Sequence, residues 1–132
     1  MFTVVYEFRV NPGLEEVFHL HWRDVTRLIQ EERKSLGSRL HRSKDGSFIA
    51  YAQWPSREMW SNPPVSSPAL AKAVEQMNAC LNHFEIKLEL EVVDDLLTHN
   101  ADSSYRKHNE ASVGLRQLKP HGTHNTDESK SL

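Results

Sequence analysis

The residues best suited to chemistry in this 132-residue chain are histidines and arginines placed near aromatic side chains. Arg39 and His41 occupy alternate positions of one short segment, so on a strand they share a face. An arginine stabilises a developing anion, and a histidine moves protons near neutral pH. The pair also fits an exposed or interfacial strand edge, where ion pairs contribute little. Alternation alone leaves both interpretations open.

His21 lies on an apolar stripe of helical period and should therefore point toward the interior. A buried neutral imidazole needs a hydrogen-bond partner, so a core histidine is the simplest interpretation. Beside an aromatic cavity the same side chain suits a general base. Trp54 and Trp60 flank a proline at one end of a predicted strand, where they fit either packing or a pocket wall.

Other polar groupings carry less chemistry. His19 and His21 diverge by about 200° on a helix, and His121 and His124 lie in a polar tail, so we expect no metal site. Cys80 lies on an apolar helical arc, which favours inert packing and excludes an intrachain disulfide. The glutamates after Phe84 alternate with apolar residues, which is typical of a solvated strand face.

Periodicity predicts the elements that must position these residues. Alternation predicts strands over 2–10, 38–43, 48–54 and 84–92, whereas apolar spacing of three and four predicts helices over 14–33 and from 67 to about 81. Ser56 and Ser67 are expected to cap a helical turn and the second helix, respectively. The order β-α-β-β-α-β predicts an α+β, ferredoxin-like fold, with two helices on one face of a four-stranded antiparallel sheet. Phe84, Ile86, Leu88 and Leu90 should all face those helices.

Composition limits the class of protein. The formal net charge is -2, so nothing favours binding to nucleic acid, and no apolar run is long enough for a membrane helix. One cysteine and the absence of a secretory leader predict a cytoplasmic protein. Residues 1–93 are expected to form the domain, and 94–132 a polar extension that is flexible or partly helical around 105–118.

The sequence resembles the antibiotic biosynthesis monooxygenase domains over roughly residues 2 to 93. The resemblance rests on Val4–Val10, the break Asn11-Pro12-Gly13, Trp22, Gly37-Ser38-Arg39-Leu40-His41 and Tyr51-Ala52-Gln53-Trp54-Pro55-Ser56-Arg57-Glu58. It implies a homodimeric α/β barrel, in which two sheets pack face to face and each subunit keeps its own pocket. Val5, Ile49 and Tyr51 would then meet their counterparts across a two-fold axis.

The resemblance implies two chemistries. One oxidises phenolic or anthrone-like compounds with O2 and no cofactor; its pocket walls would be Tyr6, Trp22, Trp54 and Trp60, and Arg39, His41 or His21 would supply charge or a proton relay. The other degrades haem and needs an axial histidine on the second helix and an asparagine on the first strand. Val74 stands at the histidine position and Glu7 or Phe8 at the asparagine position, which disfavours haem, although Trp60 fits and His83 lies nearby.

We therefore expect a cofactor-independent monooxygenase that acts on a small aromatic or quinone-like compound. The alternative is a non-catalytic dimer that binds a small hydrophobic molecule or serves in a stress response. Fold does not distinguish these functions. An enclosed cavity that holds a titratable group beside tryptophan and tyrosine would favour the enzyme.

Overall fold

The structure is a computed structural model that describes residues 1–98. Met1–Val92 form a compact unit. The elements, in chain order, are β1 (Phe2–Val10), α1 (Glu15–Arg33), β2 (Gly37–Arg42), β3 (Phe48–Trp54), α2 (Arg57–Ser61), α3 (Pro68–Asn78) and β4 (Leu81–Glu91). The expected helix around 105–118 and the histidines at 121 and 124 lie outside the described residues, and the extension over 94–132 stays a prediction.

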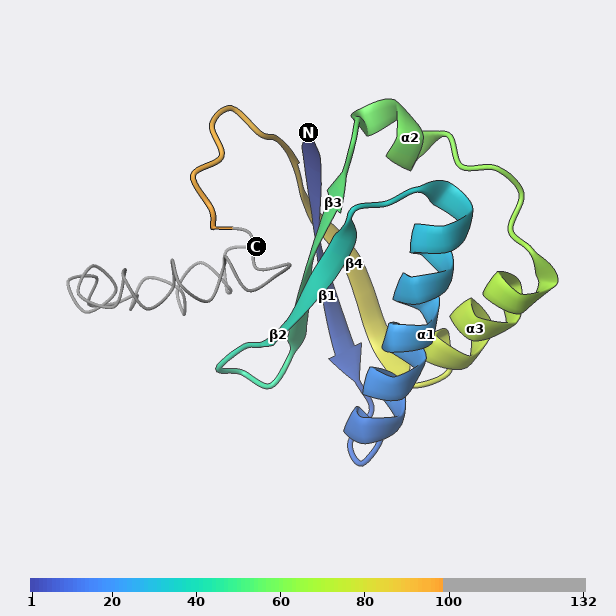
Figure 1. Ribbon diagram of the computed structural model, residues 1–132. Helices are drawn as coiled ribbons and strands as arrows, with labels where there is room; N and C mark the ends of the chain where they lie inside the picture. Colours follow the sequence, from blue (N-terminus) through green and yellow to red (C-terminus); the bar gives the residue numbers. More distant parts are fainter. Residues whose placement is uncertain (99–132) are drawn as a thin grey trace. The chain divides into compact units, whose positions relative to one another are not determined.

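The sheet confirms the ferredoxin-like fold. Its four strands run in the order β2-β3-β1-β4, and every neighbouring pair is antiparallel. Figure 1 shows α1 and α3 on the same face of the sheet. Within residues 1–98, no helix has both the length and the apolar composition that crossing a bilayer demands.

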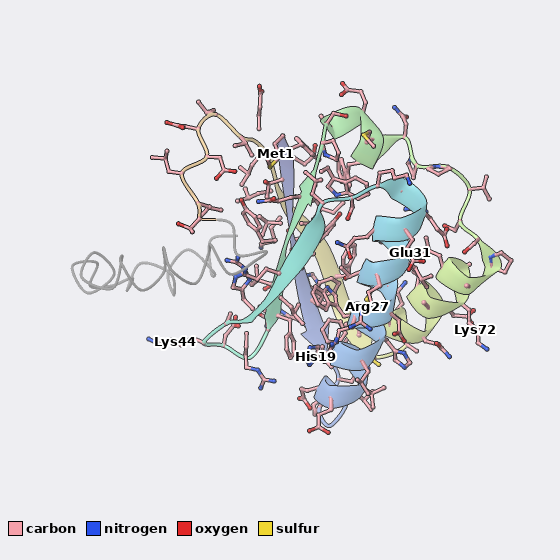
Figure 2. The ribbon with its side chains drawn as sticks, in the orientation of Figure 1. Met1, His19, Arg27, Glu31, Lys44 and Lys72 are labelled. Carbon is pink, nitrogen blue, oxygen red and sulfur yellow. The ribbon has the colours of Figure 1, made fainter. Side chains whose placement is uncertain are left out.

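The core lies between these helices and the sheet, and Figure 2 shows the side chains that fill this space. Phe18 of α1 is fully buried, and its ring centre lies 5.2 Å from that of Phe8 and 5.1 Å from that of Phe48. Leu70 of α3 is also fully buried. Because alternate residues of a strand point to opposite faces, the even-numbered residues of β1 and β3 supply the sheet's part of this core.

Both predicted serine caps are present. The Ser56 hydroxyl accepts a hydrogen bond from the Met59 amide at 3.2 Å, and the Ser67 hydroxyl accepts one from the Leu70 amide at 3.0 Å. Helix α1 ends at a left-handed C-cap that is not a glycine, since Lys34 occupies this position with a φ of 62°. Gly37 instead begins β2, with a φ of 103°.

Strand β4 departs from the predicted pattern of faces. Ile86 pairs with Tyr6 and Leu88 pairs with Val5, so Lys87 is an extra residue between two consecutive partners. A second shift, between Arg9 and Val10, leaves Asn82 as another extra residue. Such β-bulges place two residues opposite one. The eleven residues of β4 thereby match the nine of β1.

The bulge at Lys87 corrects the expectation that all the apolar residues of β4 face the helices. Phe84 and Ile86 pair with Phe8 and Tyr6 and do face them. Beyond the bulge, Leu88 and Leu90 pair with Val5 and Thr3 and lie on the opposite face, which we call the outer face. Strict alternation in the sequence carries no sign of this inversion, because a bulge changes the pairing and leaves the residue pattern intact.

Candidate functional site

A cavity of about 200 Å³ lies between the helices and the sheet. The sheet contributes Tyr6 from β1 and the alternating residues Ala50, Ala52 and Trp54 from β3. The two alanines are small, so the helix-facing side of β3 is hollow between Phe48 and Trp54. The remaining lining residues come from β1, α1, β2 and the loop before it, α3 and β4: Phe8, Trp22, Val25, Thr26, Ile29, Ser35, Ser38, Val74, Met77 and Phe84.

Three of the predicted pocket residues, Tyr6, Trp22 and Trp54, line this cavity, and Trp60 does not. Trp60 lies behind Tyr6, where its Nε1 donates a hydrogen bond of 2.8 Å to the Tyr6 hydroxyl. The Trp60 ring packs on Phe2, with ring centres 5.6 Å apart. Trp60 therefore holds a cavity residue in place from outside the cavity.

Tyr6 carries the ionisable hydroxyl of the lining. Burial raises its pKa, and the hydrogen bond from Trp60 lowers it by a smaller amount. Because the net pKa is above the ordinary value of a phenol, Tyr6 is uncharged at neutral pH. Since the hydroxyl oxygen accepts from Trp60, its own proton remains available for donation. Tyr6 can thus act as a hydrogen-bond donor.

Trp54 supplies a second donor. Its side chain is 4 % exposed, and its Nε1 is buried with no hydrogen-bond partner in the part of the chain that the structure describes. An indole N–H can only donate. Leaving such a group buried and unpaired costs about 1–3 kcal/mol, so an acceptor at this position would be stabilising. A ligand oxygen in the cavity would provide that acceptor.

The three residues proposed for catalysis do not line the cavity. Arg39 and His41 pair with Tyr51 and Ile49, and both are exposed on the outer face. His41 donates from Nδ1 to the Ile49 carbonyl at 3.1 Å. His21, on α1, is half-buried, and its Nδ1 has no partner among residues 1–98. Their catalytic roles stay predictions that this geometry does not support.

The predicted interface residues share the outer face with Arg39 and His41. Val5 pairs with Tyr51, and Ile49 lies two residues away on β3. Val5 and Ile49 are 3 % and 4 % exposed in the single chain, and Tyr51 is half-buried. Of the apolar residues on this face, Leu90 is 40 % exposed.

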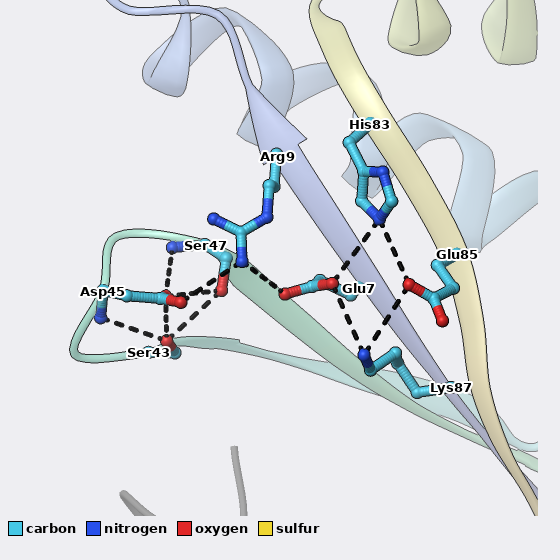
Figure 3. Close-up of polar contacts among 8 residues, drawn as sticks. All are labelled: Glu7, Arg9, Ser43, Asp45, Ser47, His83, Glu85 and Lys87. Atoms are coloured by element: carbon cyan, nitrogen blue, oxygen red, sulfur yellow. Dashed lines mark hydrogen bonds and ion pairs between the residues drawn. The ribbon is translucent and has the colours of Figure 1, made fainter. Parts of the chain in front are cut away.

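The outer face also holds an ionic cluster that the sequence analysis missed (Figure 3). Glu7 of β1 lies among Arg9, His83, Glu85 and Lys87, with its side chain 8 % exposed. The Glu7 Oε2 atom accepts a hydrogen bond of 3.1 Å from Arg9. The available signal was that Glu7 and His83-x-Glu85-x-Lys87 all occupy the polar positions of alternating strands. Of these residues, only Glu85 is assigned to a solvated strand face from the sequence.

Arg9 extends the cluster to the β2–β3 turn. Its guanidinium also donates to Asp45 at 3.3 Å. The other oxygen of Asp45 accepts from the Ser43 hydroxyl and from the Ser47 amide and hydroxyl. The hydrogen bonds from Ser43 and Ser47 lower the pKa of Asp45 well below its usual range.

No family model matches the sequence, and no curated protein matches it. Solved structures do match, and they define the fold as that of structures named antibiotic biosynthesis monooxygenase. One structure of that name has a TM-score of 0.57 and 16% identity, over 71% of this chain and 100% of its own. The fold expected from the sequence resemblance is therefore confirmed.

Two matching structures carry particular names. Rv0793 from Mycobacterium tuberculosis has a TM-score of 0.58 and 16% identity, over 73% of this chain and 98% of its own. A mutant of SnoaB, a cofactor-independent oxygenase from Streptomyces nogalater, has a TM-score of 0.58 and 18% identity, over 72% of this chain and 95% of its own. At these identities the likeness establishes the fold.

Proposed function

We propose that this protein is a cofactor-independent monooxygenase that oxidises a small aromatic compound bearing a phenol or ketone oxygen. The observation that carries the proposal is Trp54, which lines an aromatic cavity and whose buried Nε1 has no hydrogen-bond partner among residues 1–98. The name of SnoaB as a cofactor-independent oxygenase supports it, because its fold is the same. The cavity suits a ring system that stacks or packs against Tyr6 and Trp22.

The cavity stabilises an anion by donating hydrogen bonds. An electron-rich substrate such as an anthrone reacts with O2 only after it loses a proton, since the resulting enolate gives up an electron readily. Trp54 Nε1 and the Tyr6 hydroxyl are the donors that would stabilise the enolate oxygen. Stabilising the anion lowers the pKa of the substrate, which is the contribution that these residues make to the reaction.

The reaction balances without a further reductant. The anthrone CH2 loses a proton, and the enolate passes one electron to O2 to give superoxide and a carbon radical. These combine into a carbon-bound peroxide, the O–O bond breaks, and the carbon keeps one oxygen as a ketone. The products are a quinone and one water molecule. The described lining holds no histidine, carboxylate, lysine or arginine, so water takes the first proton.

Oxygen uptake with anthrone as the probe tests this proposal. EDTA-treated full-length protein should consume O2 and form anthraquinone faster than buffer alone. Trp54→Phe keeps a ring but removes the N–H, and we expect kcat/KM to fall by roughly tenfold, which corresponds to about one hydrogen bond. His19→Ala, at an exposed position of α1 outside the cavity lining, is the control and should match the wild type. Uptake no faster than in buffer would refute the proposal.

The non-catalytic alternative has one specific observation in its favour. Tyr6 is the only ionisable group among the described lining residues, and it is uncharged at neutral pH. A cavity without a base also suits simple binding of a hydrophobic metabolite. Saturable quenching of tryptophan fluorescence by anthraquinone, together with no O2 uptake from anthrone, would favour this alternative.

We also propose that the protein is a homodimer that associates through the outer face of the sheet. Both large helices lie on the other face (Figure 1), and Tyr51, Leu88 and Leu90 contribute apolar surface to the outer face. Light scattering after gel filtration should give twice the chain mass of 15.2 kDa at micromolar concentration. Leu90→Glu would then shift the protein toward the monomer, whereas Leu20→Glu, on the exposed side of α1, would not.

A further inference from the structure

The ionic cluster where β1 meets β4 contains three side chains that can coordinate a metal (Figure 3). Glu7, His83 and Glu85 each offer one ligand atom, and these atoms lie within 4.8 Å of one another. We propose that these three residues form a binding site for a divalent transition-metal ion such as Zn²⁺. The site lies on the opposite face of the sheet from the cavity and is independent of the proposed oxygenase chemistry.

The strands place the three ligands together. His83 and Glu85 are two residues apart on β4, so they point to the same face. Glu7 is the direct cross-strand partner of Glu85, and Arg9 is the partner of His83. Because hydrogen-bonded strands carry all three ligands, their spacing is fixed before an ion arrives, which favours binding.

The separations between ligand atoms suit a tetrahedral ion. His83 Nε2 lies 3.3 Å from Glu85 Oε1 and 3.6 Å from Glu7 Oε1. Bonds of about 2.0–2.2 Å to a tetrahedral ion place neighbouring ligand atoms about 3.3–3.6 Å apart. An ion can therefore reach the imidazole and both carboxylates with small side-chain adjustments.

The two oxygens of Glu7 differ in their contacts within residues 1–98. Its side chain is 8 % exposed, and Arg9 donates to Oε2. Within the described residues Oε1 accepts no hydrogen bond, and its nearest basic groups are His83 at 3.6 Å and Lys87 at 3.8 Å. The feature that points to an ion is the convergence of this carboxylate with an imidazole and a second carboxylate, whose ligand atoms lie within 4.8 Å of one another.

Lys87 sets the affinity of this site. Its ammonium lies 3.8 Å from Glu7 Oε1 and 3.6 Å from Glu85 Oε1, between the two oxygens that an ion would use. Both distances are too long for hydrogen bonds, so the lysine neutralises charge without holding the oxygens firmly. A divalent ion would displace this ammonium on its flexible stem. Lys87 is then a built-in competitor.

The donor set defines the class of ion. One imidazole and two carboxylates suit Zn²⁺ and its first-row neighbours, whereas Ca²⁺ and Mg²⁺ prefer oxygen ligands alone. Three protein ligands leave a fourth position of a zinc ion for water. The site should therefore prefer Zn²⁺ over Mg²⁺.

Calorimetric titration of the full-length protein with ZnCl2 tests the site. We expect His83→Ala to weaken zinc binding by about tenfold or more, and Lys87→Met to strengthen it, because the competing charge is gone. His19→Ala, at an exposed position of α1, is the matched histidine control and should bind as the wild type does. Circular dichroism verifies that each variant is folded; the His83 side chain is 42% exposed, so its removal leaves the core intact.

A second measurement separates this site from the other histidines of the chain. Zinc that binds the folded sheet should raise the midpoint of thermal unfolding in the wild type, and the rise should disappear in His83→Ala. Equal zinc affinity in the wild type and His83→Ala would overturn the proposal. Weaker binding in Lys87→Met than in the wild type would also overturn it.

Discussion

Tyr6 and Glu7 are consecutive residues of β1, yet they belong to opposite kinds of surroundings. Tyr6 lines an aromatic cavity in which burial keeps its hydroxyl uncharged. Glu7 is more deeply buried than the half-buried Tyr6, but two basic side chains and a histidine surround its carboxylate. The comparison shows that one strand separates two chemistries by alternation: the described cavity lining around Tyr6 contains no charged residue, whereas the outer face around Glu7 pairs charges.

The largest loss of stability should come from a substitution in the core between the helices and the sheet. Phe18→Ala removes a fully buried ring that packs between Phe8 and Phe48. The lost contacts and the remaining void should lower the free energy of unfolding by about 3–5 kcal/mol. Urea unfolding at neutral pH measures this change. Val17→Ala, at the neighbouring exposed position, should change stability by less than about 0.5 kcal/mol, and a similar loss in both variants would contradict the assignment of the core.

The contribution of the ionic cluster on the outer face can be tested by removing the charge of Glu7. Glu7→Gln leaves Arg9 and Lys87 without their shared anion, and we expect a loss of about 1–3 kcal/mol. Chemical denaturation compares it with Glu89→Gln, which breaks an exposed pair with Arg57 and should cost less than about 1 kcal/mol. A Glu7→Gln variant as stable as the wild type would show that the buried carboxylate contributes nothing measurable to the free energy of unfolding.

The cavity side should determine the behaviour at high pH. Since burial raises the pKa of Tyr6, the unfolded chain ionises first, and stability should fall as the pH rises above about 10. Trp60→Phe removes the hydrogen bond that lowers this pKa, so Tyr6 should ionise at a still higher pH. The variant should also lose about 1 kcal/mol at neutral pH.

Absorbance of tyrosinate during an alkaline titration measures the shift, and Trp22→Phe is the control, because Trp22 makes no hydrogen bond to Tyr6. Ionisation of Tyr6 at lower pH in Trp60→Phe would show that the hydrogen bond acts in the opposite sense.

The smallest effect should appear at low pH on the charged side. The pKa of Asp45 is depressed, so its contribution to stability is present above about pH 4 and is lost as the pH falls. Asp45→Asn should therefore flatten the acid limb of the stability curve and cost less than about 1 kcal/mol at neutral pH. Denaturant midpoints between pH 2 and pH 7 measure the slope. A steeper acid limb in the variant would contradict the assignment.

Much of the fold follows from periodicity in the sequence. The alternation of Phe2–Val10 and Phe48–Trp54, and the serines at 56 and 67, predicted strands and caps that the structure contains. Tyr6, Trp22 and Trp54 line the cavity, as the motifs that resemble the family implied, whereas Trp60 does not. These inferences depend on local pattern, which a single sequence carries.

The misplaced residues depend on register, which local pattern does not carry. Whether Arg39 and His41 face the helices depends on how many residues the turn to β3 contains, and the observed pairing of Arg42 with Phe48 puts them on the outer face. Glu7 and His83 are far apart in sequence, so only the pairing of β1 with β4 shows that they meet. Ala50 and Ala52 indicate a cavity only when the side chains that face them from the helices are known.

The extra residue at Lys87 inverts the parity of β4 halfway along its length. Before the bulge, the odd-numbered positions of this strand carry the charges of the outer face; after it, they carry Glu89 and Glu91 toward the helix side. Although its sequence alternates strictly, β4 therefore places apolar residues on both faces of the sheet. This arrangement is typical of an interior strand, yet β4 lies at an edge of the sheet. A loop tolerates the deletion of one residue. Deleting Lys87 would instead turn the side chains of residues 88–91 to the opposite faces of the sheet.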